Sequence, residues 1–219
     1  MIYKYKFIKF KKIIKNIIYI FIKLFSMTNI KVVFLGESDV GKTSLINRYI
    51  SDKFNEKIMS TMISTYATKS INYQDKEYSF NIWDTAGRQN YRSLNKIFLK
   101  EVNIIVLVYD ITNKQSFLEL QYWLDLILED HPDAFLILVG NKDDLFIERE
   151  IKKSDGEKFA NVIHSAFTET SAKDSHNWKA FLDNVFNNYL KMRVDSKNDK
   201  NFDDDLDDDK DILHGITYI

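Results

Sequence analysis

The chain contains no cysteine and only six glycines among its 219 residues. The absence of thiols excludes disulfides, thiolate metal sites and any prenyl or palmitoyl chain attached through sulfur. Long apolar runs are missing from the N-terminal part as well, because the longest uninterrupted one in residues 1–26, at residues 17–22, falls short of the roughly 20 residues that span a membrane. The length fits one domain with appendages at its ends.

Charge is distributed unevenly although the formal net charge is only −1. Residues 1–29 hold seven lysines and no acid, whereas residues 195–211 hold nine aspartates and three lysines. A nucleic-acid binder needs a basic face on its folded domain, and the balanced middle of the chain argues against that class.

The two ends of the chain are therefore predicted to lie outside the folded domain. The basic, apolar extension at residues 1–29 has two interpretations. Its first 26 residues form a helix on a membrane surface, or they correspond to upstream sequence that is not translated, with Met27 as the true start. The tail at residues 193–219 is acidic and predicted to be disordered, either as a contact tail or as a solvated end.

Two of the six glycines belong to a motif that is typical of phosphate binding. Residues 36–43 have the sequence Gly-Glu-Ser-Asp-Val-Gly-Lys-Thr and lie between a strand-like run and a helix-like one. Such a loop points successive backbone N–H groups at one anion, and the helix start adds partial positive charge. We expect Lys42 to reach the β- and γ-phosphates of a nucleoside triphosphate, and Thr43 to ligate Mg²⁺. The other contacts expected from this loop come from Gly36, Ser38, Asp39, Val40, Gly41 and Ser44.

Two later segments indicate which base the nucleotide carries. The Asp144 carboxylate follows the apolar run 135–139 and can accept from both N–H donors on the edge of guanine. Adenine has no such paired edge, so the sequence favours GTP over ATP and sets aside an ATP-using kinase. Residues 171–173 would offer backbone N–H groups to the guanine carbonyl. The residues expected at the base are Asn141, Lys142, Asp144, Ser171, Ala172 and Lys173.

A third segment, residues 83–87, points to the metal and the terminal phosphate. It has the sequence Trp-Asp-Thr-Ala-Gly and ends a strand-like run. Asp84 would hold Mg²⁺ through water, and Gly87 would present its N–H to the γ-phosphate.

Apolar and amphipathic runs alternate along the middle of the chain, which predicts an α/β sheet covered on both faces. Ligands of such sheets bind outside the carboxyl ends of the strands, where these motifs fall. Strands are predicted at 30–35, 66–73, 77–83, 103–109, 135–140 and 166–170, and helices at 42–51, 92–100, 115–129, 152–164 and 176–192.

With residues 80–87, 106–112 and 168–173, these motifs resemble the Ras superfamily of small GTPases, and most closely the Rab family. The resemblance covers residues 30–192 and implies a three-layer P-loop G domain with a mostly parallel central sheet. It also implies a monomeric switch that binds GTP or GDP with Mg²⁺, and effector, exchange-factor and GTPase-activating partners. The implied role is vesicle traffic, in the cytoplasm or at the cytosolic face of an endomembrane.

The resemblance extends to the first switch of the family, at residues 54–66. Thr61 lies nineteen residues after Lys42, and its hydroxyl would join Mg²⁺ only beside a γ-phosphate; Ser60, Ser64 and Thr65 are alternatives. Phe54 either packs against the guanine or is a core aromatic. After Thr61 the family usually has Ile-Gly, whereas this chain has Met-Ile.

The second switch departs more strongly from the family. Arg88 stands where the family has a glutamine that orients the attacking water, and an arginine side chain can only donate. Three outcomes are open: slow hydrolysis, Arg88 acting as an internal arginine finger, or a register shift that brings in Gln89. The chain also lacks the C-terminal cysteines that anchor Rab proteins, so membrane attachment would use residues 1–26, a partner, or nothing.

Overall fold

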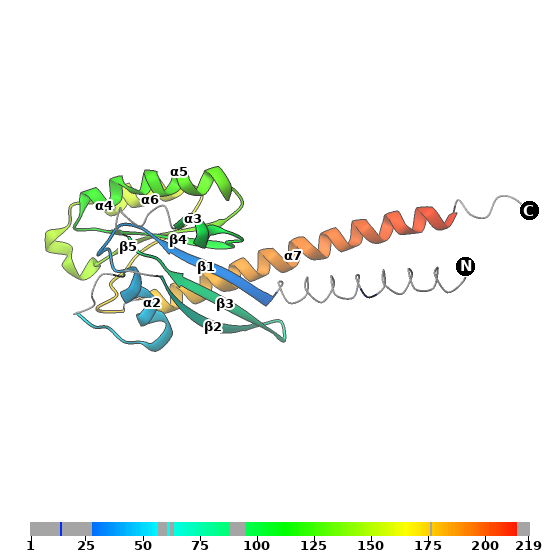
Figure 1. The fold of residues 1–219 in the computed structure, drawn as a ribbon, viewed down its shortest axis with the longest axis horizontal. Coiled ribbons are helices and arrows are strands. Elements are labelled where there is room, and N and C mark those ends of the chain that lie inside the picture. The colour runs from blue at the N-terminus through cyan, green and yellow to red at the C-terminus, as the bar shows by residue number, and fades with distance from the viewer. Residues whose placement is uncertain are drawn as a thin grey trace, which may run out of the picture. The chain divides into compact units, whose positions relative to one another are not determined.

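The computed structural model describes residue 14, residues 28–56, 61, 64–87, 95–175 and 177–213, with side chains up to 195. The first of its two compact units ends at Trp178 and contains a six-stranded sheet in the order β2-β3-β1-β4-β5-β6 (Figure 1). The strands are β1 (Asn29–Leu35), β2 (Thr65–Tyr73), β3 (Lys76–Asp84), β4 (Ile104–Asp110), β5 (Phe135–Asn141) and β6 (Ala166–Glu169).

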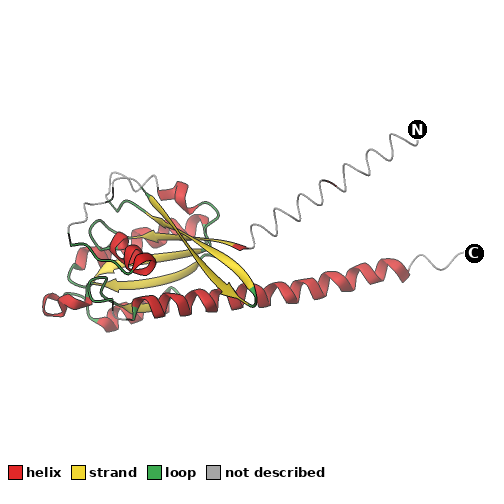
Figure 2. Ribbon diagram, turned by 90° about the horizontal axis from the view of Figure 1, so that it is seen from below, coloured by secondary structure: helices red, strands yellow, loops and turns green. Residues whose placement is uncertain are grey.

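All neighbouring strands pair in parallel except β2 and β3, which form an antiparallel hairpin. The hairpin turns at Gln74 and Asp75, whose φ angles are 48° and 59°. Positive φ at both turn positions matches the twist of the flanking strands. The mostly parallel sheet confirms the predicted fold class, and its twist is visible in Figure 2.

Helices cover both faces of this sheet, with α2 on one side and α3, α5 and α6 on the other (Figure 1). Every residue of β4 is buried, as its continuously apolar sequence predicts. Between the sheet and α5, the fully buried Trp123 belongs to the main apolar cluster. The helices are α2 (Lys42–Ser51), α3 (Asn95–Leu99), α4 (Lys114–Leu118), α5 (Leu120–Asp130), α6 (Lys153–Val162) and α7 (Trp178–Leu213), with a 3₁₀ helix η2 (Asp143–Glu148).

The predicted helix at 115–129 is two helices in the structure. Asn113 caps α4 by accepting a hydrogen bond from the Ser116 N–H, and Glu119 separates α4 from α5. Helix η2 was not predicted, because a 3₁₀ turn of six residues leaves no helical period in the sequence.

The last helix also differs from the prediction. Its backbone is helical to Leu213, whereas the sequence predicts a helix ending at residue 192 and a disordered tail from 193. Residues 178–213 contain neither glycine nor proline, so nothing in the backbone chemistry interrupts the helix. Among the described residues, no helix is long and apolar enough to cross a bilayer. The N-terminal extension lies outside the described residues, apart from single positions and the start of β1.

Candidate functional site

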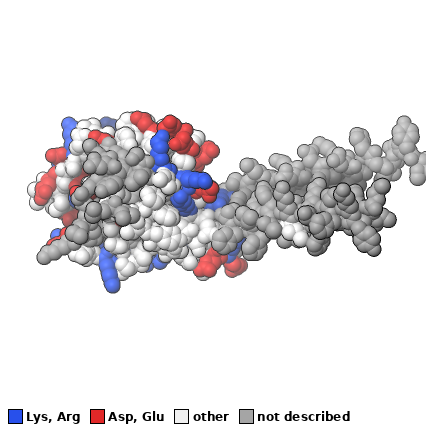
Figure 3. Space-filling model, in the orientation of Figure 1, with Lys and Arg blue, Asp and Glu red and all other residues white. Residues whose placement is uncertain are grey.

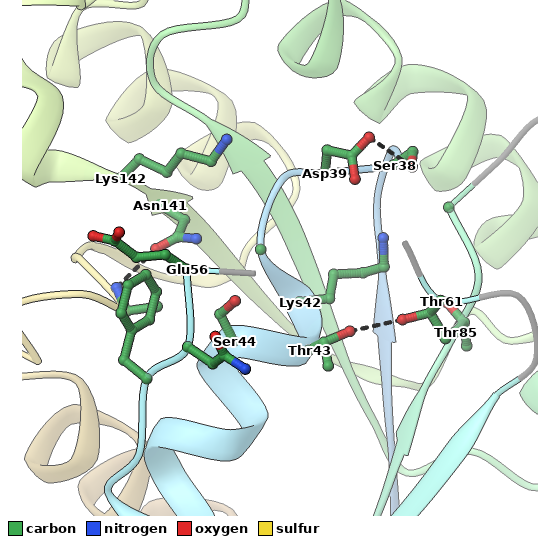
Figure 4. Close-up of a pocket in the computed structure, with 15 residues that line it drawn as sticks. Ser38, Asp39, Lys42, Thr43, Ser44, Glu56, Thr61, Thr85, Asn141 and Lys142 are labelled. Atoms are coloured by element: carbon green, nitrogen blue, oxygen red, sulfur yellow. Dashed lines mark hydrogen bonds between the residues drawn. The ribbon is translucent and has the colours of Figure 1, made fainter. Parts of the chain in front are cut away.

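The carboxyl ends of β1, β3 and β5 meet around a cavity of about 290 Å³ (Figure 4). The loops that follow these strands, together with the start of α2, supply most of its lining, which is the arrangement expected of a parallel sheet. The lining residues are Ser38, Asp39, Gly41, Lys42, Thr43, Ser44, Phe54, Asn55, Glu56, Thr61, Thr85, Gly87, Asn141, Lys142 and Ala172.

The loop between β1 and α2 is shaped by two glycines. Gly36 has φ 140°, and a Cβ there would collide with the Val108 carbonyl oxygen. Gly41 has φ 94°, and a Cβ there would meet the Asn141 side-chain amide. Both positions therefore require glycine, which explains why a chain poor in glycine retains it here.

Lys42 begins α2 and is almost completely buried within this loop. Its Nζ donates to the carbonyl oxygens of Gly36 and Glu37, at 2.8 and 2.6 Å. Burial lowers the Lys42 pKa to about 8, against the opposing effect of the Asp84 and Glu37 carboxylates. A buried ammonium held inside a loop of backbone N–H groups is suited to bind phosphate.

Three residues from different segments meet beside Lys42. The Thr43 hydroxyl donates to Asp84 Oδ2 at 2.5 Å. Thr61 Oγ1 lies 2.8 Å from Thr43 Oγ1 (Figure 4). It donates to the same Asp84 oxygen at 3.2 Å. Of the candidate hydroxyls in the first switch, the described one that lines the cavity is Thr61.

This cluster fits a magnesium ion. Asp84 Oδ1 is buried and has no hydrogen-bond partner in the part of the chain that the structure describes. Burial raises the pKa of Asp84, so the carboxylate gains from a nearby cation. Hydroxyl and carboxylate oxygens are the donors that Mg²⁺ prefers. The described residues contain no group of three or more His, Cys, Asp and Glu side chains that could hold another kind of metal ion.

Asn141 connects the loops on the base side of the cavity. Its side chain is buried, with Nδ2 donating to the Val40 carbonyl at 2.8 Å and Oδ1 accepting from the Ala172 N–H at 3.1 Å. Asp144 accepts a 2.5 Å hydrogen bond from the Ser171 hydroxyl. The structure thus brings together the segments that the sequence assigns to guanine.

The two lysines expected near the base differ in their contacts. Lys142 lines the cavity, and its ammonium lies 2.6 Å from Asp110 Oδ2. The backbone N–H of Lys173 donates to Ser171 Oγ at 3.1 Å. Of the N–H groups predicted to face the guanine carbonyl, those of Ala172 and Lys173 therefore already have acceptors within the protein.

Two arginines that sequence reasoning missed support the base-side loops. Arg48 on α2 donates to the carbonyls of Ala172 and Lys173, at 2.9 and 2.8 Å. Its guanidinium lies 6.0 Å from the ring of Phe54, which lines the cavity rather than the core. In the sequence, an arginine that contacts another loop cannot be distinguished from one on the solvent-exposed face of an amphipathic helix, so no motif indicated this contact.

Arg149 follows η2 and connects the loop after β5 to β6. It donates to Glu169 through both terminal nitrogens, at 2.7 and 2.8 Å, and to Asp143 Oδ1 at 2.7 Å. The Glu169 side chain is nearly buried. The proposed catalytic positions, Arg88 and Gln89, lie outside the described residues.

Fold and cavity together define a P-loop nucleotide-binding protein. The family model of the Ras family matches residues 31–191, which is most of the chain. The chain belongs to the Ras family and is a small GTP-binding switch protein. Members of this family bind GTP or GDP, typically with Mg²⁺, and interact with regulators and effectors.

Proposed function

We propose that this GTP-binding protein is Rab-like and acts in intracellular vesicle traffic. In its GTP state it recruits partner proteins at the cytosolic face of an endomembrane. The sequence resemblance supports this role, and one structural observation adds to it: an aromatic surface beside the metal site.

The aromatic surface consists of Tyr66 on β2, Trp83 on β3 and Phe98 on α3. The Tyr66 and Trp83 ring centroids are 5.1 Å apart, and those of Trp83 and Phe98 are 5.6 Å apart. Tyr66 is 56% exposed. A hollow of about 400 Å³ adjoins the rings of Tyr66 and Trp83 and is also lined by Lys31 and Asn81.

Exposed, clustered aromatic side chains are typical of protein-binding surfaces. Trp83 directly precedes Asp84, so the surface begins one residue from the metal site. A change at the metal site would therefore alter the contacts between these rings and a bound partner.

The test is made in the native cells with the full chain carrying a C-terminal fluorescent tag. We expect the wild type to label vesicular membranes. Thr43→Asn, which weakens GTP binding, should become diffuse and slow the transport of a secreted reporter. Normal secretory and endocytic transport under expression of this variant would contradict the role.

A matched pair of variants isolates the aromatic surface. Tyr66→Ala should bind GTP normally and lose membrane recruitment. Tyr73→Ala removes a tyrosine at the other end of the same strand and should keep both properties. If both variants are recruited like the wild type, partners do not use this surface.

A second candidate function is a GTP-bound platform that hydrolyses slowly or not at all, favoured by Arg88 at the usual glutamine position. Ras, with its glutamine, turns over at only about 3–5 × 10⁻⁴ s⁻¹, and we expect this chain at or below that order. In single-turnover phosphate release, Arg88→Gln should be faster than the wild type and Gln89→Ala unchanged. A faster wild-type rate that Gln89→Ala abolishes would show that Gln89 has taken over the role.

We further propose that residues 1–26 supply a membrane contact. Lysines near anionic lipid contribute about 1 kcal/mol each. A protein beginning at Met27 should bind GTP normally and fail to bind anionic vesicles. Equal vesicle binding by both lengths would refute this attachment.

A further inference from the structure

Arg48 on α2 contacts two separate walls of the base side of the cavity. One wall is the backbone of residues 172–173, whose carbonyls accept from Nε and Nη2 at 2.9 and 2.8 Å. The other wall is the segment that follows α2. There Nη1 donates to the Asp52 carbonyl at 2.9 Å, and the guanidinium carbon lies 6.0 Å from the ring centroid of Phe54. Because Phe54 and Ala172 both line the cavity, one side chain connects two of its walls.

These contacts use the fork geometry of a guanidinium. Nε and Nη2 lie on one edge of the planar group and match the two consecutive carbonyls, while Nη1 is free to bind the other segment. A lysine ammonium carries all its donors on one atom and has no flat face for an aromatic ring. The Arg48 side chain is only 14% exposed, so water replaces lost contacts incompletely. The arrangement therefore requires arginine rather than a positive charge alone.

A second contact joins the same two segments at the surface. Lys173 Nζ lies 3.3 Å from Glu56 Oε1, and these side chains are 51% and 71% exposed. Acidic and basic side chains are also interspersed on the face of the described part seen in Figure 3. Exposed pairs of this kind contribute little and are screened by salt. The half-buried contacts of Arg48 are thus the stronger connection between the walls.

We propose that Arg48 is a positioning residue for guanine, which holds Phe54 and the backbone of residues 172–173 at a fixed separation. The base then enters a preformed slot, and binding avoids the entropic cost of ordering two segments. Arg48 acts through these walls, since it does not itself line the cavity. The inference concerns the GTP binding typical of the family and does not depend on the role in traffic.

The experiment measures release of a fluorescent GDP analogue, in Mg²⁺ and an excess of unlabelled GDP. It compares the full-length wild type with Arg48→Lys, Phe54→Leu and the double variant. We expect Arg48→Lys to release nucleotide about tenfold faster, which corresponds to one hydrogen bond to a charged group. The matched control is Ser51→Ala, which removes a side-chain hydrogen bond to the Asn47 carbonyl on the same helix and should release at the wild-type rate.

The double variant separates positioning from general support of helix α2. If Arg48 acts through the wall that contains Phe54, the double variant should release more slowly than the product of the two single effects predicts. Because lysine keeps the charge, the ratio between Arg48→Lys and wild type should be the same at low and high salt.

Three results would overturn the proposal: wild-type release by Arg48→Lys, single effects that multiply in the double variant, or a difference that disappears at high salt. If Arg48→Lys does not fold, Arg48→Gln takes its place in the cycle with the same expected pattern. Its amide can still donate to one of the two carbonyls.

Discussion

Replacing Asp84 by asparagine should have opposite effects on the loaded and the nucleotide-free protein. Asp84 Oδ1 is buried without a hydrogen-bond partner among the described residues, and burial raises the pKa of this carboxyl. The charged form is therefore unfavourable until a cation approaches. The Asp84→Asn change removes that charge at almost constant volume.

The two magnitudes follow from the burial and from metal binding. Burying an unsatisfied charged group costs more than the ~1–3 kcal/mol of an unsatisfied neutral group, and the amide keeps only the smaller cost, so the nucleotide-free Asp84→Asn protein should be more stable than the wild type. At a metal concentration a hundred times its Kd, bound Mg²⁺ contributes about 2.7 kcal/mol to the loaded protein. At about 2–4 °C per kcal/mol for a domain of this size, the loss of Mg²⁺ lowers Tm by about 5–10 °C.

Calorimetry of both forms, with Mg²⁺ or with EDTA, checks the prediction. EDTA should lower the Tm of the GDP-loaded wild type and leave that of Asp84→Asn unchanged. Asp125→Asn, an exposed acid-to-amide change on α5, should behave as wild type throughout. A nucleotide-free Asp84→Asn protein less stable than wild type, or one still sensitive to EDTA, would refute the reasoning.

Three further predictions concern the base, the phosphate loop and the arginine after η2. Asp144→Asn should lower GTP affinity about ten- to a hundredfold and favour xanthosine nucleotides; a competition titration in which the unmutated protein takes ATP as well as GTP would contradict it. Because burial lowers the Lys42 pKa to about 8 in the folded state, the folded protein loses this proton before the unfolded chain does. The free energy of unfolding of the nucleotide-free protein should therefore rise between pH 8 and 9.5, a range whose upper end is about one unit below the unfolded Lys pKa of roughly 10.4. Lys42→Met should abolish this rise in urea titrations. Arg149→Ala leaves the nearly buried Glu169 unpaired and should cost about 2–3 kcal/mol in the same assay, with partial recovery in Arg149→Lys; a loss within the ~0–1 kcal/mol of a surface pair would contradict it.

The contiguous parts of the site could be predicted from sequence because local chemistry determines them. The glycines at 36 and 41 are required by the backbone of one loop, and Lys42 follows them directly. The continuously apolar strand β4 could only be a central strand, and this placed the motifs at one edge of the sheet. Such features depend on a few neighbouring residues, which is why the pattern was sufficient.

The features that could not be predicted from the sequence depend on contacts between distant segments. Arg48 reaches the carbonyl of Ala172, 124 residues away, and nothing in the helix around it distinguishes this arginine from a solvated one. The break between α4 and α5 falls at Glu119, with no glycine or proline nearby to indicate it in the sequence. The roles assigned to Arg88 and Gln89 stay predictions, since those residues lie outside the described part.

The cluster of Thr43, Thr61 and Asp84 limits how strongly a partner can distinguish the GTP-bound from the GDP-bound state through Thr61. The Thr61 hydroxyl donates its one proton to Asp84 Oδ2, so a protein group holds this side chain at the metal site. At about 0.5–1.5 kcal/mol, this bond favours the bound position of the Thr61 side chain by about two- to tenfold. A complete population shift between two states requires about 10⁴-fold differential affinity. Since this contact with Asp84 favours the bound position of Thr61 in both nucleotide states, a partner that recognises Thr61 should distinguish GTP from GDP over a narrower range than it would if the contact were missing.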